Sequence, residues 1–449
     1  MVEAYAQSSE DQLIDGLSFK LGNSASYITK RDSCTFHATG SNVYMGEGAG
    51  TKVIRFNLNA ENGWLDPSTV RVMFNVDNTD TTADHFLRPL QGPHSFIRRL
   101  RISAGGCLLE DINDYNRLHQ QFSILTSEDN RDCDDIEGFG YRSDTVEPGG
   151  VHSEIGKTLR GIAPGSSHIV GFKLLSGIFN QPKMIPLKYC PLTVELELVG
   201  RNLDPIVDPS TAHVGFTTAN TSVSWQLSDV KLKCDIVTLD NSLQNNYDSH
   251  LLSGKSLPLN YNTYIVQNQT ISGSKVSVNM SRAISRLKSI FVSLYRTPAA
   301  GAERPEDKEW LNFYHPMSTT IDKVYDKSLE LEFQVQVGST TMPQYPITSL
   351  SESYAHLKKS IGILGSNFHS TSISPMQYRS THFMVGIDTE KSLGASWTGL
   401  NTRAGDLLTV KMSSDTAPAI AAVQATQMFI VLHSDNVMEI SDGGVAVYD

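Results

Sequence analysis

The sequence predicts an all-β fold made of two consecutive jelly-roll or sandwich domains, each carrying one short helix. Many short segments alternate apolar and polar residues, as half-buried strands do, and few segments have helical spacing. A strand unit followed directly by one amphipathic helix occurs twice, about half a chain apart, without letter-by-letter identity between the two copies. A chain of 449 residues is also long enough for two large β domains.

The first strand-then-helix unit covers residues 97–125. Residues 97–103 read as a strand, and Gly105-Gly106 supplies a turn that tolerates positive φ before a return strand. Asp111 is then predicted to cap a helix. Apolar residues recur on one face of this helix at steps of three and four: Ile112, Tyr115, Leu118, Phe122 and Leu125.

The second unit begins with residues 329–337, which alternate as a half-buried strand and end at Gly338. Ser349 and Glu352 form an S-x-x-E capping box, which predicts the start of a helix. Gly362 is expected to end that helix. Its apolar face contains Leu350, Tyr354, Leu357 and Ile361.

Composition divides the chain into four parts. Residues 1–50 are predicted to be an N-terminal arm because they are rich in Ser, Asn and Gly. Residues 51–240 are predicted to form an N-terminal jelly roll, residues 241–260 a polar linker, and residues 261–449 a C-terminal jelly roll. Within the first domain, the polar stretch 126–165 is expected to be a loop with a functional or interaction role.

The remaining predicted strands fill both halves of the chain. They are residues 53–58, 70–76, 168–175, 192–199, 230–237, 263–271, 287–295, 382–387, 407–412, 428–433, 437–440 and 445–448. A turn at Asp442-Gly443-Gly444 separates the last two, so we expect the chain to close on a paired strand.

The charge and hydropathy of the chain argue against two classes of function, nucleic-acid binding and membrane spanning. A net charge of −11 disfavours broad nucleic-acid binding, which needs clustered Lys and Arg. The densest basic cluster, Arg98, Arg99 and Arg101, is expected to be a solvated strand face. No apolar run reaches the roughly 18 residues of a membrane span. Because a signal peptide is also missing, we expect the protein to be made and folded inside a cell.

Familiar catalytic and metal-binding patterns are missing from the sequence. Gly156-Lys157-Thr158 lacks the first glycine and the preceding strand of a phosphate loop, and no G-x-S-x-G occurs. The histidines lack metal-ligand spacing, and the acidic cluster 132–137 lacks the spacing of an EF-hand. The five cysteines form no C-x-x-C pair and are expected to be reduced. We therefore expect no catalytic, cofactor-binding or metal-binding residues. The chain is expected to be a structural or binding protein rather than an enzyme.

Three stretches carry a family resemblance. The first is the sequence R-R-L-R-I-S-A-G-G at 98–106 with the helix that contains Tyr115-Asn116. The second runs over residues 179–196, and the third holds N-V-M-E-I at 436–440 and G-G-V-A at 443–446. In this order the stretches resemble the double jelly-roll major capsid proteins of polinton-like viruses, virophages and nucleocytoplasmic large DNA viruses.

The resemblance implies two eight-stranded jelly rolls, each with a short helix after a β-hairpin. It implies a homotrimer that forms a pseudo-hexameric capsomer, and capsomers that tile an icosahedral shell around a dsDNA genome, in a virion assembled inside the host cell. Implied partners are neighbouring capsomers, penton and minor capsid (cement) proteins and any internal membrane, without sequence-specific nucleic-acid binding. Deleting residues 1–45 is then expected to leave a folded trimer and to impair shell closure.

Two alternatives use the same β architecture. One is a receptor- or glycan-binding virion spike. The other is a two-jelly-roll glycan hydrolase, which needs paired carboxylates, and Asp240 and Asp248 near the predicted linker are the candidates. A stable trimer favours the shell protein, whereas a monomer favours the enzyme.

Overall fold

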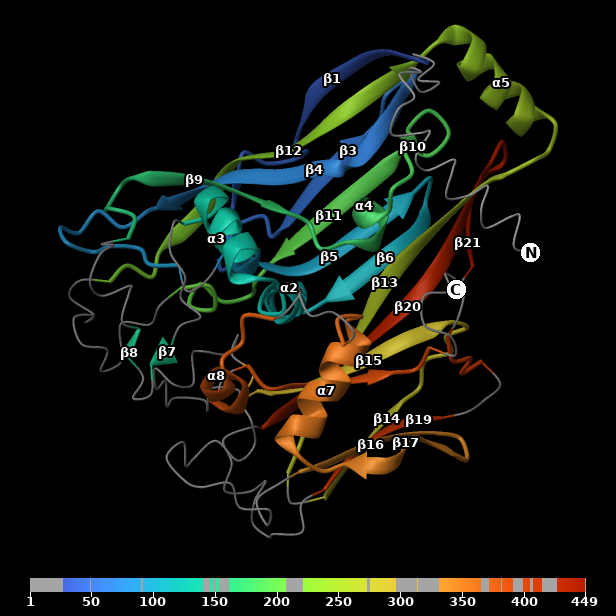
Figure 1. The fold of residues 1–449 in the computed structure, drawn as a ribbon. Coiled ribbons are helices and arrows are strands. Elements are labelled where there is room, and N and C mark those ends of the chain that lie inside the picture. The colour runs from blue at the N-terminus through green and yellow to red at the C-terminus, as the bar shows by residue number, and fades with distance from the viewer. Residues whose placement is uncertain are drawn as a thin grey trace, which may run out of the picture.

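The computed structural model contains two β-sandwiches side by side (Figure 1). The structure describes residues 27–48, 50–89, 92–139, 146–147, 151–152, 161–206, 221–272, 275–295, 313, 331–364, 371–380, 382–390, 399–403, 407–413 and 426–448. Within these ranges no helix combines the length and the apolar character that a membrane crossing requires.

The N-terminal sandwich packs two antiparallel sheets. Its strands are β1 (Ile28–His37), β2 (Val43–Tyr44), β3 (Val53–Leu58), β4 (Gly63–Asn78), β5 (Ile97–Ala104), β6 (Cys107–Asn113), β9 (Ser167–Lys173), β10 (Ile185–Pro186), β11 (Leu192–Leu198) and β12 (Trp225–Leu239). In one sheet β1, β12 and β4 are neighbours, β4 also pairs with both β9 and β10, and β2 pairs with β12. The other sheet has the order β3-β11-β5-β6.

The C-terminal sandwich repeats this arrangement. Its strands are β13 (Leu257–Thr270), β14 (Lys275–Met280), β15 (Leu287–Tyr295), β16 (Glu332–Val337), β17 (Thr340–Ile347), β18 (Met384–Asp388), β19 (Leu408–Ser413), β20 (Gln427–Ser441) and β21 (Gly444–Tyr448). One sheet has the order β13-β20-β15-β18, with β21 on β20, and the other has the order β14-β19-β16-β17. A separate small hairpin joins β7 (Val146–Glu147) and β8 (Val151–His152).

The helices lie in the connections between strands. They are η1 (Pro93–Phe96), α2 (Tyr115–Ser123), α3 (Glu128–Glu137), α4 (Gly177–Asn180), α5 (Asn241–Leu252), α7 (Leu350–Ser360) and α8 (Pro375–Ser380). Helix α5 connects the last strand of the N-terminal sandwich to the first strand of the C-terminal one, at the upper end of the molecule in Figure 1.

The two sandwiches share one strand order. If the eight longer strands of each half are numbered along the chain, leaving out β2, β7, β8, β10 and the terminal β21, one sheet reads 1-8-3-6 and the other 2-7-4-5 in both halves. This is the arrangement of a jelly roll. The α2–α3 pair and the α7–α8 pair also occupy the same connection, between strands five and six. The prediction of two consecutive eight-stranded jelly rolls, each with a helix after a hairpin, is therefore confirmed.

The burial pattern of each strand follows from what covers its two faces. β11 alternates buried and half-buried residues, as a strand with one core-facing side should. β15 is buried almost throughout, because its sheet carries the core on one face and α7 with the N-terminal sandwich on the other (Figure 1). A Cβ at Gly386 on β18 would lie 3.1 Å from the Leu357 Cα of α7, so the helix lies directly on the sheet.

The first hairpin is confirmed, but the predicted start of its helix is wrong. Gly105 and Gly106 adopt φ angles of 55° and 88° in the turn. β6 continues to Asn113, and α2 starts at Tyr115. Asp111 therefore caps no helix; it accepts two hydrogen bonds from Arg99, Nε to Oδ1 at 2.7 Å and Nη2 to Oδ2 at 2.6 Å. Burial of alternate apolar residues extends the strand beyond the position where helical spacing was inferred.

The second helix begins and ends as predicted. Ser349 Oγ accepts a hydrogen bond from the Glu352 N–H at 3.1 Å, and Glu352 Oε2 accepts one from the Thr348 N–H at 3.0 Å. Gly362 follows the helix with a φ of 77°. The sequence interpretation missed β17 before this helix, because its two prolines argue against a strand; at the edge of a sheet they are tolerated.

Three of the predicted irregular segments contain regular structure. β1 and β2 fall inside the predicted arm, and β1 pairs with β12 over nearly its full length. The predicted linker holds α5, and the predicted loop 126–165 holds α3. Residues 1–26 and Gly156-Lys157-Thr158 lie outside the described residues. A deletion that tests the arm must therefore stop at residue 26, because removal of residues 1–45 would strip β1 from its sheet.

Candidate functional site

The two sandwiches meet along a seam, which we define as the contact of β6, α2 and α4 with β13, β15, β20 and β21. Tyr261 Oη donates a hydrogen bond to the Leu109 carbonyl oxygen at 2.8 Å, which joins β13 to β6. The Asn268 side chain of β13 donates to the Asp114 carboxylate at the start of α2. These bonds tie the first strand of the second sandwich to the hairpin and helix of the first.

Helix α2 supplies the seam with an aromatic and cationic contact. The Phe122 ring lies 5.0 Å from that of Tyr264 and 5.3 Å from that of Phe291. The Arg117 guanidinium, on a side chain only 4% exposed, stacks 3.2 Å from the Tyr295 ring centre. Burial raises the pKa of Tyr295, and the Arg117 charge opposes that rise. Helix α2, which the sequence periodicity indicated, therefore forms much of the seam between the two sandwiches.

At α4 the two sandwiches touch backbone to backbone. A Cβ built on Gly177 would lie 1.4 Å from the carbonyl oxygen of Asn262 on β13 and 2.6 Å from its carbonyl carbon. Only glycine fits this approach, since no side-chain rotation can relieve a clash with backbone atoms. The motif F-N-Q-P at 179–182, singled out in the sequence, directly follows this contact.

A buried carboxyl group holds α4 in place. Glu110 of β6 is 1% exposed; its Oε1 accepts from the Gly177 N–H at 2.9 Å, and its Oε2 accepts from the Ser176 hydroxyl. Burial raises the pKa of Glu110 to about 7, and these hydrogen bonds limit the rise. The carboxyl group therefore positions the helix that meets Asn262.

We expect stability to fall as pH rises through the titration of Glu110. Because the folded-state pKa lies above the ordinary value of 4.5, the contribution is complete below pH 4.5 and lost by about pH 7. The difference corresponds to about 3 kcal/mol. Glu110→Gln keeps the acceptor oxygen and removes the charge. The free energy of unfolding of this variant, measured in urea, should therefore not fall by this amount between pH 4.5 and 8. Glu47→Gln, at an exposed position, is the control, and its free energy of unfolding should fall with rising pH as in the unchanged protein.

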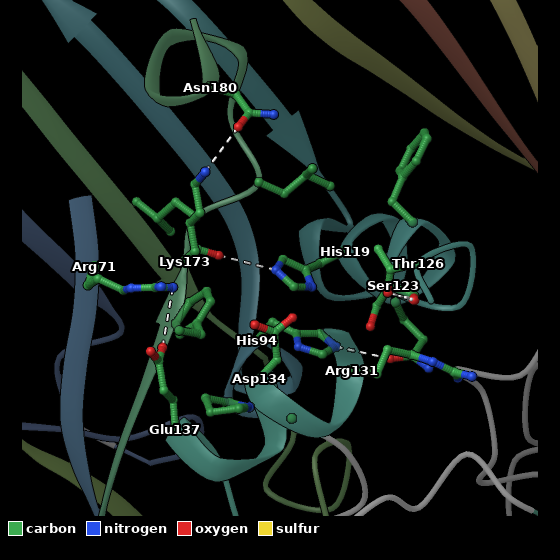
Figure 2. Close-up of a pocket in the computed structure, with 17 residues that line it drawn as sticks. Arg71, His94, His119, Ser123, Thr126, Arg131, Asp134, Glu137, Lys173 and Asn180 are labelled. Atoms are coloured by element: carbon green, nitrogen blue, oxygen red, sulfur yellow. Dashed lines mark hydrogen bonds and ion pairs between the residues drawn. The ribbon is translucent and has the colours of Figure 1, made fainter. Parts of the chain in front are cut away.

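A cavity of about 310 Å³ lies beside the seam, between α2, α3 and β9 (Figure 2). The imidazole rings of His94 and His119 stack in its wall, with centroids 4.1 Å apart and planes at 17°. His119 Nε2 donates to the Lys173 carbonyl oxygen at 3.3 Å, and His94 Nε2 lies 3.1 Å from Gln120 Oε1. Burial lowers the pKa of His119 to about 4 and that of His94 well below its usual range, so both rings are neutral at neutral pH.

Charged side chains complete the cavity wall. Cations come from three elements, with Arg71 on β4, Arg131 on α3 and Lys173 on β9. Glu137 pairs with Arg71 at 3.2 Å, and burial raises the pKa of the neighbouring Asp134. The cavity lining therefore carries three basic and two acidic side chains around the imidazole pair. The sequence did not predict this histidine pair, because 25 residues separate the two positions and no metal-like spacing marks them.

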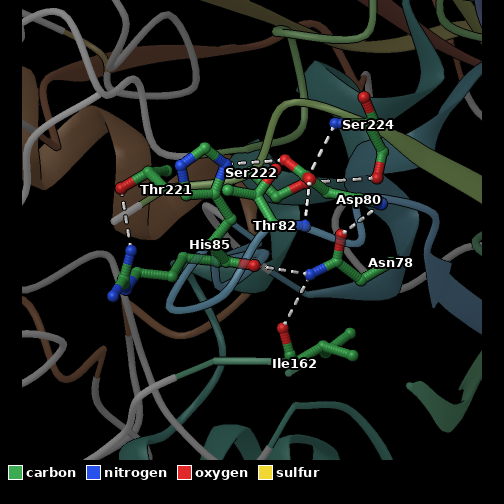
Figure 3. Close-up of polar contacts among 9 residues, drawn as sticks. Asn78, Asp80, Thr82, His85, Ile162, Thr221, Ser222 and Ser224 are labelled. Carbon is green, nitrogen blue, oxygen red and sulfur yellow. Dashed lines mark hydrogen bonds and ion pairs between the residues drawn. The ribbon is translucent and has the colours of Figure 1, made fainter. Parts of the chain in front are cut away.

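A second polar cluster fastens the loops at one end of the N-terminal sandwich (Figure 3). Asn78 Nδ2 donates to the carbonyl oxygens of His85 and Ile162, at 2.9 and 3.0 Å. Asp80 accepts from the Thr82 N–H at 2.8 Å, and its Oδ2 lies 2.7 Å from His85 Nδ1. The Thr82 and His85 contacts hold the pKa of Asp80 at about 2. This cluster orders loops that are far apart in sequence.

Solved structures match this architecture over nearly the whole chain. VP54 of PBCV-1, fitted into a reconstruction of the virophage Sputnik, has a TM-score of 0.61 at 12% identity, covering 96% of this chain and 99% of that one. The Sputnik virophage structure gives 0.59 at 8% identity (96% and 90%), and the Faustovirus major capsid protein gives 0.57 at 10% (95% and 94%). The chain has the fold of the double jelly-roll major capsid proteins. No family model and no curated protein matches its sequence.

In this double jelly-roll chain, the two carboxylates considered for glycan hydrolysis have local structural contacts. Asp240 caps α5 and accepts hydrogen bonds from the Ser242 hydroxyl and from the Ser242 N–H, the latter at 3.1 Å, and these bonds lower the pKa of Asp240. Asp248 accepts from Lys188 Nζ at 3.1 Å. Asp240 is the N-cap of α5 and Asp248 lies eight positions further along, a backbone rise of about 12 Å along the helix axis, whereas glycosidase carboxyl pairs lie roughly 5–9.5 Å apart. Among the described residues, no group of three His, Cys, Asp or Glu side chains could hold a metal ion.

Proposed function

We propose that the chain is a major capsid protein, a structural subunit of an icosahedral virion rather than an enzyme. The observation that carries this proposal is the pair of jelly rolls with one strand order and one helix position, held side by side by the seam. Solved viral capsid structures with the same architecture support it.

Three copies form the proposed building block. A threefold ring of such chains presents six similar sandwiches, and this pseudo-hexagonal outline tiles a closed shell without a second kind of subunit in each facet. Neighbouring capsomers, penton and minor capsid proteins, and any membrane beneath the shell are the proposed partners. The shell would enclose a dsDNA genome, and the virion would be assembled inside the host cell.

The chain is proposed to bind no specific nucleic-acid sequence. Two of the three arginines in its densest basic cluster, Arg99 and Arg101, lie beside carboxylates on neighbouring strands. Arg99 pairs with Asp111 at 2.6 Å, and Arg101 lies 3.9 Å from Glu195, which also pairs with Arg55 at 2.5 Å. Paired arginines on a strand face offer little free charge for phosphate contacts.

The oligomeric state and particle shape test this proposal together. Light scattering after size exclusion should give three times the 49.4 kDa of the chain. Negative-stain electron microscopy of the same fraction should show particles with a hexagonal outline. A monodisperse monomer over a wide range of protein concentration and ionic strength would contradict the proposed role.

We expect residues 1–26 to act in contacts between capsomers. Deleting them leaves β1 intact, so the truncated chain should still form the trimer and melt within a few degrees of the full-length protein. Shell assembly, counted as closed particles by electron microscopy, should fall sharply. Dissociation of the trimer on this deletion would assign the segment to the trimer instead.

A further inference from the structure

Two cysteines face each other across the first pair of strands. β1 and β12 are antiparallel, and the register places Cys34 directly opposite Cys234. Two residues along, Phe36 lies opposite Leu232, and both pack on the core. Because directly opposed residues in a sheet share a face, the two thiols point to the same inner side.

The spacing of such a pair suits a disulfide bond. Directly opposed residues on antiparallel strands have Cα atoms about 4.5–5.5 Å apart. Disulfides bridge Cα atoms separated by about 4.4–6.8 Å. Both thiols are free in this structure. Disulfides also need Cβ atoms about 3.5–4.5 Å apart, slightly closer than the roughly 4.5–5.5 Å of directly opposed residues, so oxidation would draw the two strands together by about 1 Å and keep their register.

The surroundings give the two thiols different exposure. Cys234 is 1% exposed within the core, whereas Cys34 is half-buried on an edge strand where a small oxidant can reach it. Burial raises the pKa of Cys234 to about 12, with Cys34 the next contributor, so the two groups interact electrostatically. A buried thiol resists deprotonation, so the more accessible Cys34 should react first.

We propose that Cys34 and Cys234 form an intramolecular disulfide under oxidising conditions, which fastens the edge strand β1 to the central strand β12. The oxidant is a low-molecular-weight disulfide such as oxidised glutathione. The Cys34 thiolate attacks one of its sulfurs, which forms a mixed disulfide and releases one glutathione thiolate. Cys234 then gives up its proton and attacks Cys34 Sγ, which releases the second glutathione. Two protein thiols are oxidised by two electrons, and one glutathione disulfide is reduced to two thiols.

The timing of this reaction rests on the proposed function. A subunit assembled in a reducing cell would keep both thiols, and a particle released into an oxidising medium would acquire the bond. The covalent link would then hold the first strand in place after assembly is complete.

Oxidation of the purified full-length protein tests the chemistry. After treatment with oxidised glutathione, non-reducing peptide mapping should recover a cross-linked pair of peptides containing residues 34 and 234. The melting temperature should rise by roughly 4–8 °C and return after dithiothreitol. Cys34→Ser should abolish both effects. Cys107→Ser, which removes a thiol opposite Ala104 in the β5–β6 hairpin, should keep them.

Two results would overturn the inference. One is full alkylation of Cys234 in denatured samples of the oxidised wild-type protein, which would show that the thiol had remained free. The other is an unchanged rise in melting temperature in Cys34→Ser. Peptide mapping of released particles and of intracellular protein tests the timing separately. If the purified protein forms the disulfide but never forms particles, the proposed capsid role is contradicted. The disulfide inference is then still supported.

Discussion

Replacing Gly177 with alanine is expected to destabilise the protein by about 3 kcal/mol, because the new methyl group would overlap backbone atoms of the other sandwich. Its Cβ would lie 1.4 Å from the Asn262 carbonyl oxygen, so α4 and β13 must move apart. That movement would also pull the Gly177 N–H from Glu110. The melting temperature should fall by roughly 6 °C or more, and protease should cut the connecting segment around α5 faster.

A matched glycine separates the seam from general effects of the substitution. A Cβ at Gly200 meets nothing within 4 Å, and its φ does not require glycine. Gly200→Ala should therefore change the free energy of unfolding by no more than about 0.5 kcal/mol. Equal stability of the two variants would mean that the sandwiches do not touch at α4 as described.

Acidification should destabilise the N-terminal sandwich through the stacked histidines. The folded-state pKa of His119 is about 4 and that of His94 is lower still, against 6.5 for an ordinary histidine, because both rings are buried. The neutral pair therefore contributes its full stability above pH 6.5, and this is lost as the pH falls toward 4. For His119 alone the loss is about 3 kcal/mol. Three basic side chains (Arg71, Arg131 and Lys173) and two acidic ones (Asp134 and Glu137) also line the cavity, but burial is the largest cause of both lowered pKa values, and His119 further lowers the pKa of His94.

Glu110 titrates in the same pH range with the opposite sign, so the histidine effect is best measured in the Glu110→Gln background. Urea unfolding at pH 7, 5.5 and 4.5 should then show a steady loss of stability. The double variant His94→Phe/His119→Phe keeps two stacking rings that do not titrate. Its free energy of unfolding should therefore change little with pH, so the slope of that free energy against pH should be nearly flat. His37→Gln, at an exposed position on β1, should leave the slope unchanged. A full slope in the double variant would assign the acid sensitivity to other groups.

Local signals were sufficient for three features of the fold. The Gly105-Gly106 turn, the Ser349 capping box and the C-terminal hairpin each follow from residues close together in the sequence. Other elements carry little local signal. In β1 only Asp32, Cys34 and Phe36 are half-buried and the other residues are exposed, so its strand character depends on pairing with β12, about 200 residues away. In α5 only Leu251 is buried, which leaves no apolar periodicity to detect.

The seam and the cavity could not be predicted because their contacts join distant segments. Gly177 gave no reason to expect Asn262 within contact distance, since a glycine without positive φ has no local signature. Glu110 read as a polar residue of an alternating strand, although the folded chain buries it under α4. His94 and His119 become neighbours only when η1 and α2 pack together.

The direct backbone contact between α4 and β13, with Arg117 and Phe122 packed beside it, leaves no flexible layer between the two halves of the molecule. The two sandwiches of each chain should therefore move as one rigid body. In the shell that we propose, curvature would then come from the angles between neighbouring molecules, so the contacts at their outer edges, and not bending within one molecule, would set the particle size.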